Sequence, residues 1–273
     1  MNTCSSPAVL VHGWKSSPAV WKKLASRLAA ESIPCWNFDF SGMGNVHPAA
    51  IAQALQQYIA EMRAGSGYRG PVDIISHSTG GFIVRYMLEV LDGKGKSERV
   101  RQFIALGPPN NGSAMAELFN DPVHGKEVLA TLAGVFVPRK YNPAEDLIVQ
   151  ALRPASATTA ELRSAGTRGD ILYRMIVTEN RAQNEAFFPP FQGRTWEYEN
   201  GRWHTSYAGD GVISHADARL PGAGLDVLPA DPDRCMVPPQ RYCHIMMPAN
   251  PEIIDRIVCY LQDPATAPHR ICE

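Results

Sequence analysis

The sequence lacks the long hydrophobic runs of a membrane protein and the basic segments of a nucleic-acid-binding protein. Its apolar runs fall far short of the roughly 18 residues that a helix needs to cross a bilayer. Its 26 lysine and arginine residues are balanced by 27 aspartate and glutamate residues, and no dense basic run occurs. We therefore expect neither an integral membrane span nor nucleic acid as a partner, although transient contact with a lipid surface stays open.

Cysteine is sparse, and the N-terminus has no targeting pattern. The 6 cysteines show no C-x-x-C spacing for zinc and are too few for a disulfide scaffold. We expect most of them to be free and buried, while Cys235 with Cys243, or Cys259 with Cys272, could pair in an exported protein. Residues 1–7 contain no basic segment followed by an apolar one. The sequence thus predicts a cytoplasmic protein, or a secreted one if a leader was removed.

Short apolar runs alternate with amphipathic segments along the chain. The apolar runs predict buried strands at 8–12, 33–40, 72–76, 100–106 and 171–177. The spacing of apolar residues predicts helices at 18–30, 51–62 and 79–91. This alternation indicates an α/β protein with a mostly parallel central sheet and helices on both faces. A length of 273 residues fits one such domain, spanning residues 1–273.

Two long connections interrupt this pattern. Residues 112–169 contain helix-like pieces at 114–119, 128–137 and 147–152, and residues 181–206 are irregular and rich in aromatic side chains. Connections of this length in a compact domain are usually functional. We predict that both are cap or lid insertions over one edge of the sheet. A peripheral subdomain that only packs on the core would give the same pattern.

The strand predicted at 72–76 leads into Ser76-His77-Ser78-Thr79-Gly80, a serine between small residues at the start of a helix. A sharp strand-to-helix turn would push the Ser78 hydroxyl out above the sheet and leave the backbone N–H of Thr79 free. The spacing is that of a G-x-S-x-G elbow with Ser76 in place of the first glycine. An ordinary loop in which Ser78 caps the helix would have the same sequence.

A nucleophilic serine needs a histidine as its base and a carboxylate that orients the histidine. His244 is the best placed of the 8 histidines. It precedes a last helix predicted at 251–258, with Asn250 as its cap and Pro251 at its first position, and so lies at the same sheet edge as the serine. For the acid, Asp210 lies on a glycine-flanked turn between the serine and the histidine in chain order. Glu179 is the alternative acid, followed by Asp217 and Asp226.

Six segments together resemble the α/β-hydrolase superfamily, and within it microbial lipases and carboxylesterases. They are residues 11–14, 39–44, 76–81, 106–113, 209–212 and His244, in the order in which the family has them. The resemblance implies an α/β-hydrolase fold and a triad of Ser78, Asp210 and His244. It also implies an oxyanion hole formed by the backbone N–H groups of Trp14 and Thr79. Two departures from the family pattern are Ser76 in place of glycine and Pro108 in place of threonine.

These residues predict a serine hydrolase that cleaves carboxylic esters through an acyl-enzyme intermediate, with no metal and no organic cofactor. An apolar run at 187–191 favours a small-molecule ester or lipid as the substrate. We expect substrate contacts from His12, His77, Phe187, Phe188 and Phe191. A thioesterase, an amidase or an acyltransferase would use the same apparatus. A non-enzymatic binding protein on this fold, or a module that contacts a lipid surface through residues 187–203, are the alternatives from other classes.

Overall fold

A seven-stranded sheet forms the centre of the molecule, in a computed structural model that describes residues 6–230, 238–266 and 270–271. The strand order is β2-β1-β3-β4-β5-β8-β9. Six strands run parallel: β1 (Ala8–Val11), β2 (Cys35–Phe38), β3 (Val72–His77), β4 (Val100–Leu106), β5 (Leu172–Thr178) and β8 (Gly224–Leu228). The seventh, β9 (Arg270–Ile271), pairs antiparallel with β8 at the edge. The predicted α/β class with a mostly parallel sheet is confirmed.

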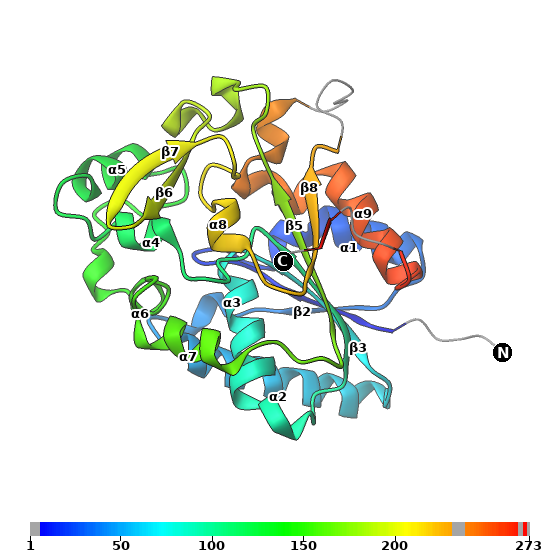
Figure 1. Cartoon of the computed structure of the whole chain (residues 1–273). Helices are drawn as coiled ribbons and strands as arrows, with labels where there is room; N and C mark the ends of the chain where they lie inside the picture. Colours follow the sequence, from blue (N-terminus) through cyan, green and yellow to red (C-terminus); the bar gives the residue numbers. More distant parts are fainter. Residues whose placement is uncertain (1–5, 231–237, 267–269, 272–273) are drawn as a thin grey trace.

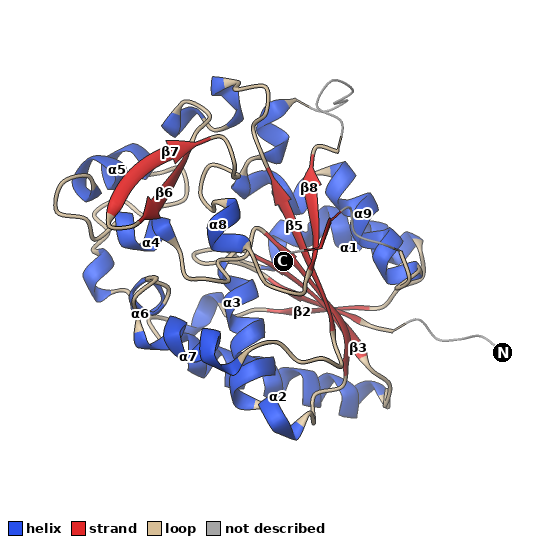
Figure 2. Ribbon diagram, viewed as in Figure 1, coloured by secondary structure: helices blue, strands red, loops and turns tan. Residues whose placement is uncertain are grey.

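Helices cover both faces of this sheet (Figure 2). On one side lie α1 (Lys22–Ala30) and α9 (Pro251–Gln262), and on the other lie α2 (Pro48–Ser66) and α3 (Thr79–Arg85) (Figure 1). α9 begins where the Asn250 side chain accepts the N–H groups of Glu252 and Ile253, a capping arrangement that satisfies two otherwise free donors. In α2, the apolar face predicted from spacing is buried in the core. The helices therefore form where the sequence patterns indicated.

β8 was not among the strands predicted from the sequence. Its central residue is Asp226, and a carboxylate interrupts the apolar run that marks a buried strand. In the folded chain the Arg256 guanidinium donates to both oxygens of Asp226, at 2.9 and 3.0 Å. The arginine comes from α9, so only the tertiary structure makes this strand acceptable in the interior.

Four helices follow β4 in the segment that the sequence singled out as the first long connection. They are α4 (Ala114–Leu118), α5 (Gly125–Leu132), α6 (Leu147–Ala151) and α7 (Ala157–Ala165). The predicted piece at 128–137 was too long, because the helix ends at Leu132, and α7 was not predicted. Figure 1 shows α4 and α5 together at one side of the molecule, away from α1 and α9.

The second long connection is more regular than expected. It contains an antiparallel hairpin of β6 (Thr195–Glu199) and β7 (Arg202–Ser206), and a short helix α8 (His215–Ala218) follows. The hairpin turn is Asn200-Gly201, with both residues at positive φ (51° and 77°). An Asn-Gly pair is the usual two-residue hairpin turn, so this signal was present in the sequence and the expectation of an irregular segment was wrong.

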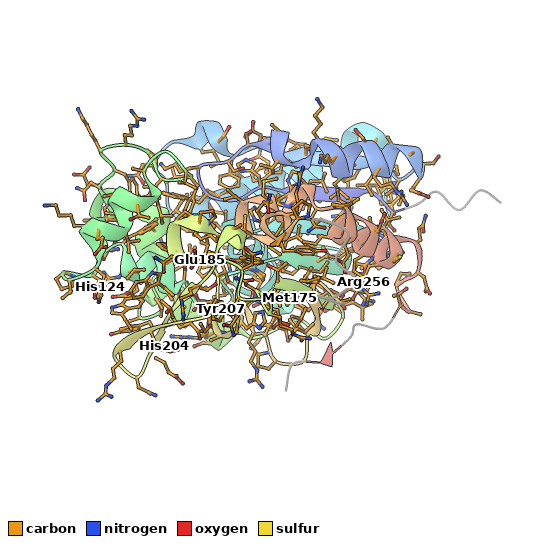
Figure 3. The ribbon with its side chains drawn as sticks, turned by 90° about the horizontal axis from the view of Figure 1, so that it is seen from above. His124, Met175, Glu185, His204, Tyr207 and Arg256 are labelled. Atoms are coloured by element: carbon orange, nitrogen blue, oxygen red, sulfur yellow. The ribbon has the colours of Figure 1, made fainter. Side chains whose placement is uncertain are left out.

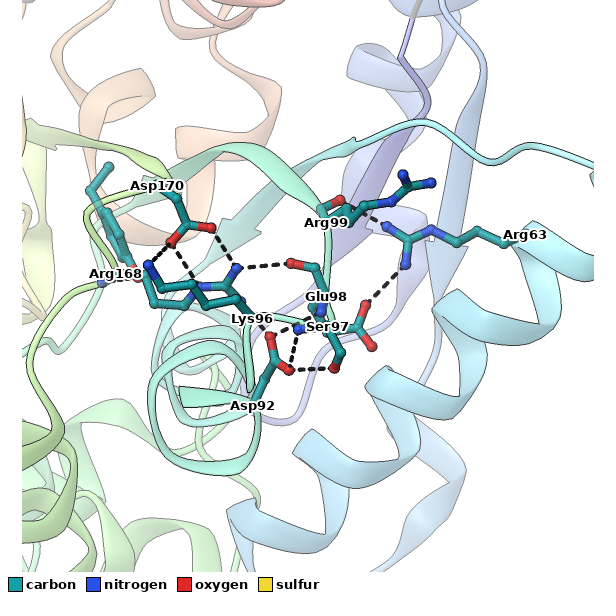
Figure 4. A network of polar contacts seen from close by, with 9 residues as sticks. Arg63, Asp92, Lys96, Ser97, Glu98, Arg99, Arg168 and Asp170 are labelled. Carbon is teal, nitrogen blue, oxygen red and sulfur yellow. Dashed lines mark hydrogen bonds and ion pairs between the residues drawn. The ribbon is translucent and has the colours of Figure 1, made fainter. Parts of the chain in front are cut away.

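A network of ion pairs lies at the end of the sheet where β4 and β5 begin (Figure 4). Arg168 binds both Asp92 and Asp170, and the Arg63 guanidinium donates to Glu98 at 3.1 Å. These residues join α2 to the segments that lead into the two strands. The network lies away from the carboxyl ends of the strands, where ligands of parallel sheets bind.

The described residues contain no helix that is both long and apolar enough to cross a bilayer. In the same part of the chain Cys35, Cys243 and Cys259 are unpaired. Each of the two disulfides considered from the sequence includes a cysteine outside the described residues, Cys235 or Cys272.

Candidate active site

Ser78 occupies the sharp turn between β3 and α3. Its backbone has φ 54° and ψ −131°, a conformation that costs a residue with a side chain about 1–3 kcal/mol. The Ser78 N–H donates to the Leu106 carbonyl at 2.9 Å, which ties the turn to β4. A Cβ atom at Gly80 would lie 2.5 Å from the His12 carbonyl oxygen, so α3 can approach the end of β1 this closely only with a glycine at position 80. The sharp strand-to-helix turn predicted at Ser78 is confirmed.

The first glycine of the elbow pattern is replaced by Ser76, and the structure accommodates it. Ser76 is fully buried in β3 between Val11 of β1 and Ala105 of β4. A Cβ atom at Gly81 would lie 3.4 Å from the Ser76 oxygen, an ordinary contact distance, but 2.7 Å from the Pro108 Cβ, so Gly81 leaves room for Pro108. Within the described part of the chain its hydroxyl has no hydrogen-bond partner.

The structure brings Ser78, His244 and Asp210 into one hydrogen-bonded chain. The Ser78 Oγ lies 2.8 Å from His244 Nε2, and His244 Nδ1 lies 2.7 Å from Asp210 Oδ2. His244 is 5% exposed and Asp210 is 1% exposed. With the imidazole proton on Nδ1, the histidine donates to the carboxylate while its Nε2 accepts from the hydroxyl. This is the geometry in which a histidine can remove the proton of a serine.

The turn at residues 209–213 aims the Asp210 carboxylate. Its Oδ1 accepts the N–H groups of Val212 and Ile213 at 2.9 and 2.7 Å, which leaves Oδ2 for the histidine. The His244 N–H donates to the Asp210 carbonyl at 2.9 Å, so the two loops are also joined through the backbone. From β6, the Thr195 hydroxyl accepts the Gly211 N–H at 2.8 Å.

The other carboxylates considered from the sequence have different partners. Glu179 forms an ion pair with Arg181. Asp217 accepts the Ala114 N–H at 2.9 Å, and burial raises the pKa of Asp217 to about 7. Asp226 binds Arg256 from α9. Of the four carboxylates considered, the one in contact with His244 is that of Asp210.

Gly107 was not singled out as a site residue, yet it lies against the acid and the base. It follows β4 with φ +50°, and a Cβ atom there would lie 2.6 Å from Asp210 Oδ2 and 3.1 Å from His244 Nδ1. A glycine directly after a buried strand, in the run Leu-Gly-Pro-Pro, is the signal that could have identified it.

His77 supports His244 from below. A carbonyl oxygen can only accept, so His77 Nε2 donates to the His244 carbonyl at 2.9 Å, and the two rings lie 4.6 Å apart. Burial, with a further contribution from His244, lowers the pKa of His77 well below its usual range. His77 is therefore neutral, and its ring also lines the cavity beside Ser78.

His12 lies beneath the loop that follows β1. Two groups lie 3.2 Å from His12 Nε2, the Phe40 N–H and Asp39 Oδ1. The Phe40 N–H can only donate, and with Nε2 as its acceptor the ring proton is on Nδ1, which donates to the Gly13 carbonyl at 2.9 Å. In a trans peptide the carbonyl and the N–H point in opposite directions. By holding the Gly13 carbonyl, His12 thus fixes the direction of the Trp14 N–H, a structural contact in place of the substrate contact expected from the sequence.

Trp14 and Thr79, the residues expected to supply oxyanion N–H groups, both line the cavity that contains Ser78. Among the described residues neither backbone N–H has a hydrogen-bond partner. Free donors next to a nucleophile are the groups that could bind an oxyanion.

A cavity of about 290 Å³ opens above Ser78 and His244. Its apolar wall comes largely from the segment between β4 and β5, through Met115, Phe119, Phe136, Ile148, Val149 and Leu152.

The three phenylalanines expected to bind substrate lie elsewhere. Phe187 and Phe188 are buried in the core, and Phe191 lines a separate surface cavity. A Cβ atom at Gly211 would lie 2.5 Å from the Phe188 ring, so this side chain packs against the turn that carries Asp210. Of the apolar run at 187–191, Phe187 and Phe188 belong to the core, and composition alone does not distinguish such residues from a substrate site.

In the described ranges 6–230, 238–266 and 270–271, no group of three or more histidine, cysteine, aspartate or glutamate side chains is arranged to hold a metal ion.

A parallel sheet with a serine on a strand-to-helix turn, followed in the chain by an aspartate and a histidine at the same edge, has the architecture of an α/β hydrolase. Residues 8–271 match the model of the alpha/beta hydrolase family, and the chain belongs to that family.

Similar solved structures include several lipases. Mature Bacillus licheniformis lipase BlEst2 has a TM-score of 0.66 at 17% identity, over 95% of this chain and 93% of that one. Phospholipase PlaB from Legionella pneumophila has a TM-score of 0.63 at 17% identity, over 94% and 60% of the two chains. Aspergillus fumigatus lipase B has 0.62 at 14% identity, over 98% and 55%. At such identities the likeness shows the fold alone, and no curated protein sequence matches this chain.

Proposed function

We propose that this protein is a serine hydrolase that cleaves carboxylic esters, as a carboxylesterase or lipase. Ser78 is the nucleophile, His244 the general base and Asp210 the acid that orients the histidine. The observation that carries the proposal is the pair of hydrogen bonds, 2.8 Å and 2.7 Å long, that links the three side chains beside an apolar cavity lined by Ser78 and His244.

The reaction proceeds by acyl transfer to water. His244 Nε2 takes the Ser78 proton as the oxygen attacks the ester carbonyl, and Asp210 stabilises the imidazolium that forms. The N–H groups of Trp14 and Thr79 bind the oxyanion, each such donor being worth about 3 kcal/mol. His244 then gives the proton to the leaving alcohol, and a water activated by the same nitrogen releases the acid.

Residues 112–169, the cap segment, form the cap over this site in our proposal, since most of the apolar wall comes from them. An apolar wall favours an uncharged acyl chain, because a charged group would lose its hydration there without a partner. The substrate class is therefore a neutral ester or lipid. Residues 181–206 were also expected to belong to the cap, and that expectation stays a prediction.

The test combines covalent labelling with turnover. A fluorophosphonate probe should label the wild-type protein at Ser78, and aryl acetate, octanoate and palmitate esters should be hydrolysed. Ser78→Ala should lose labelling and roughly 10⁴-fold or more of kcat. Ser164→Ala, at an exposed serine of α7, is the matched control and should behave as wild type. Hydrolysis that survives in Ser78→Ala would refute the assignment.

A further inference from the structure

Trp14 lies on the loop that follows β1, and its side chain packs against the cap segment. Its ring lies 5.3 Å from that of Tyr141, 6.4 Å from Phe119 and 6.5 Å from Phe136, measured between centroids. All three partners belong to residues 112–169. The residue proposed to supply one oxyanion N–H is therefore held, through its side chain, by another part of the chain.

One buried carboxylate fixes the orientation of this indole. The Trp14 Nε1–H donates to Asp146 Oδ2 at 3.0 Å. The other oxygen, Oδ1, accepts the N–H groups of Ile148 and Val149 at 3.1 Å each and so caps α6. Lys15 Nζ lies 3.5 Å from Oδ2 and adds a partly exposed counter-charge. A single side chain thus joins the start of a cap helix to the loop beside the nucleophile.

Asp146 is anchored independently of Trp14. Asn45, on the connection between β2 and α2, donates from its amide to the Glu145 carbonyl at 2.7 Å. Its amide oxygen accepts the Leu147 N–H at 2.9 Å. The residues on both sides of Asp146 are thereby tied to the body of the fold. The carboxylate has a fixed position from which it can hold the tryptophan.

The loop that carries Trp14 needs such a contact. Lys15, the next residue, has φ +50°, a left-handed conformation that costs about 1–2 kcal/mol in a residue with a side chain. Strained backbone of this kind persists only where the surroundings hold it. The hydrogen bond from His12 to the Gly13 carbonyl holds the backbone before Trp14. The hydrogen bond from the indole to Asp146 holds the Trp14 side chain.

We propose that Asp146 is a positioning residue for the oxyanion-binding loop. By holding the Trp14 indole, it keeps the Trp14 backbone N–H where the oxyanion forms, although its own carboxylate does not touch the reacting atoms. The cap then takes part in catalysis as well as in enclosing the acyl chain. This inference rests on the proposed ester hydrolysis at Ser78.

Trp14→Phe tests it, because phenylalanine keeps a six-membered aromatic ring at this position and removes the five-membered ring that carries the indole N–H. Displacing an oxyanion donor weakens binding of the transition state and leaves binding of the ground state intact. We expect kcat and kcat/KM on an aryl octanoate to fall together by about 10- to 100-fold, with KM within about 2-fold. Affinity for a trifluoromethyl ketone, which forms a tetrahedral adduct on the serine, should fall by a similar factor.

Variants of the carboxylate give a second, independent measurement. Asp146→Asn has a single acceptor oxygen, which can accept the indole N–H or the N–H groups of α6 but not both, so it should retain an intermediate turnover. Asp146→Leu loses both acceptors and should match Trp14→Phe in kcat. This order, with asparagine between wild type and leucine, is the signature of positioning through the hydrogen bond.

The chain offers a matched control in the pair Trp203 and Asp121. The Trp203 Nε1–H donates to Asp121 Oδ2 at 2.8 Å, and Asp121 Oδ1 accepts the N–H groups of Val123 and His124 at 2.9 and 2.8 Å. The arrangement repeats that of Trp14 and Asp146, but it lies at the outer end of the molecule, where Figure 3 labels His124 and His204. Trp203→Phe should therefore retain wild-type kcat.

The outcomes separate the two proposals. If wild-type protein hydrolyses esters and Trp14→Phe keeps its kcat, the positioning role is wrong while the proposed function stands. If Trp14→Phe and Trp203→Phe lose kcat equally, the effect is general cap packing, and the inference is overturned. If wild-type protein is neither labelled nor active, the proposed function itself fails. Thermal unfolding of each variant identifies any that does not fold. Asp146→Asn then carries the comparison: a kcat below that of wild type supports the positioning role, and a wild-type kcat overturns it.

Discussion

Gly107→Ala should weaken the contact between Asp210 and His244, although Gly107 itself takes no part in the proposed reaction. The added Cβ would lie 2.6 Å from Asp210 Oδ2, whereas ordinary contact begins at 3.4 Å, so one group has to retreat by about 0.8 Å. The carboxylate is held by Val212 and Ile213, and the backbone of residue 107 is already at φ +50°. The bond between Asp210 and His244, now 2.7 Å, would then exceed the range of a normal hydrogen bond.

The magnitude follows from what that bond does. Loss of the correct histidine tautomer and orientation costs about 10⁴-fold in kcat in serine hydrolases, which sets the upper limit. A stretched but not abolished bond should cost between roughly 10²-fold and that limit. Stability should fall as well, since alanine at positive φ costs about 1–2 kcal/mol before any clash.

The assay is single-turnover acylation with an aryl ester, which reports the first chemical step directly, alongside thermal unfolding. Gly222→Ala is the control, because Gly222 has φ +77° and no atom within 4 Å of an added Cβ. It should lose stability through backbone strain and retain wild-type acylation. A Gly107→Ala protein that is folded and acylates within about 3-fold of wild type would refute the reasoning.

Two further variants test stability. Ser76→Ala removes a fully buried hydroxyl that has no hydrogen-bond partner among the described residues, so urea denaturation should show a gain of about 1 kcal/mol; a loss would mean that the hydroxyl is bonded. Asp217→Asn tests a pH effect: burial raises the pKa of Asp217 from 3.8 to about 7, so the folded state binds the extra proton and wild-type stability falls as pH rises from about 4 to 7. Urea unfolding at about pH 5 and about pH 8 should show a smaller fall for Asp217→Asn, and equal falls would contradict the assignment.

The strands and helices of the first half followed from local patterns. The apolar runs at 8–12, 72–76 and 100–106 marked β1, β3 and β4, because strands buried on both faces consist almost wholly of apolar residues. The final helix was marked by Asn250 and Pro251 at its start. β8 was not predicted, because Asp226 is compatible with burial only when Arg256, thirty residues later, binds it.

Some residues of the candidate site could likewise be predicted from the sequence, and others only from the fold. Chain order and strand ends pointed to Ser78, Asp210 and His244, since parallel strands carry their carboxyl ends to one edge. Glu179 had an equivalent position after β5, and only the fold shows that it turns to Arg181. The aromatic run at 187–191 was expected at the substrate and packs in the core and at the surface instead, because residue type does not report which cavity a side chain faces.

The sequence alone determined the class of fold, the elbow at Ser78 and the residue types available for its chemistry, because these depend on periodicity and on order along the chain. The tertiary structure alone decided the contacts between residues far apart in that order. Gly107 against Asp210 and His244, His77 beneath His244, and Asp146 on the Trp14 indole are all of this kind. Distances of a few ångströms between such segments result from how helices and loops pack on the sheet, and no local pattern encodes them.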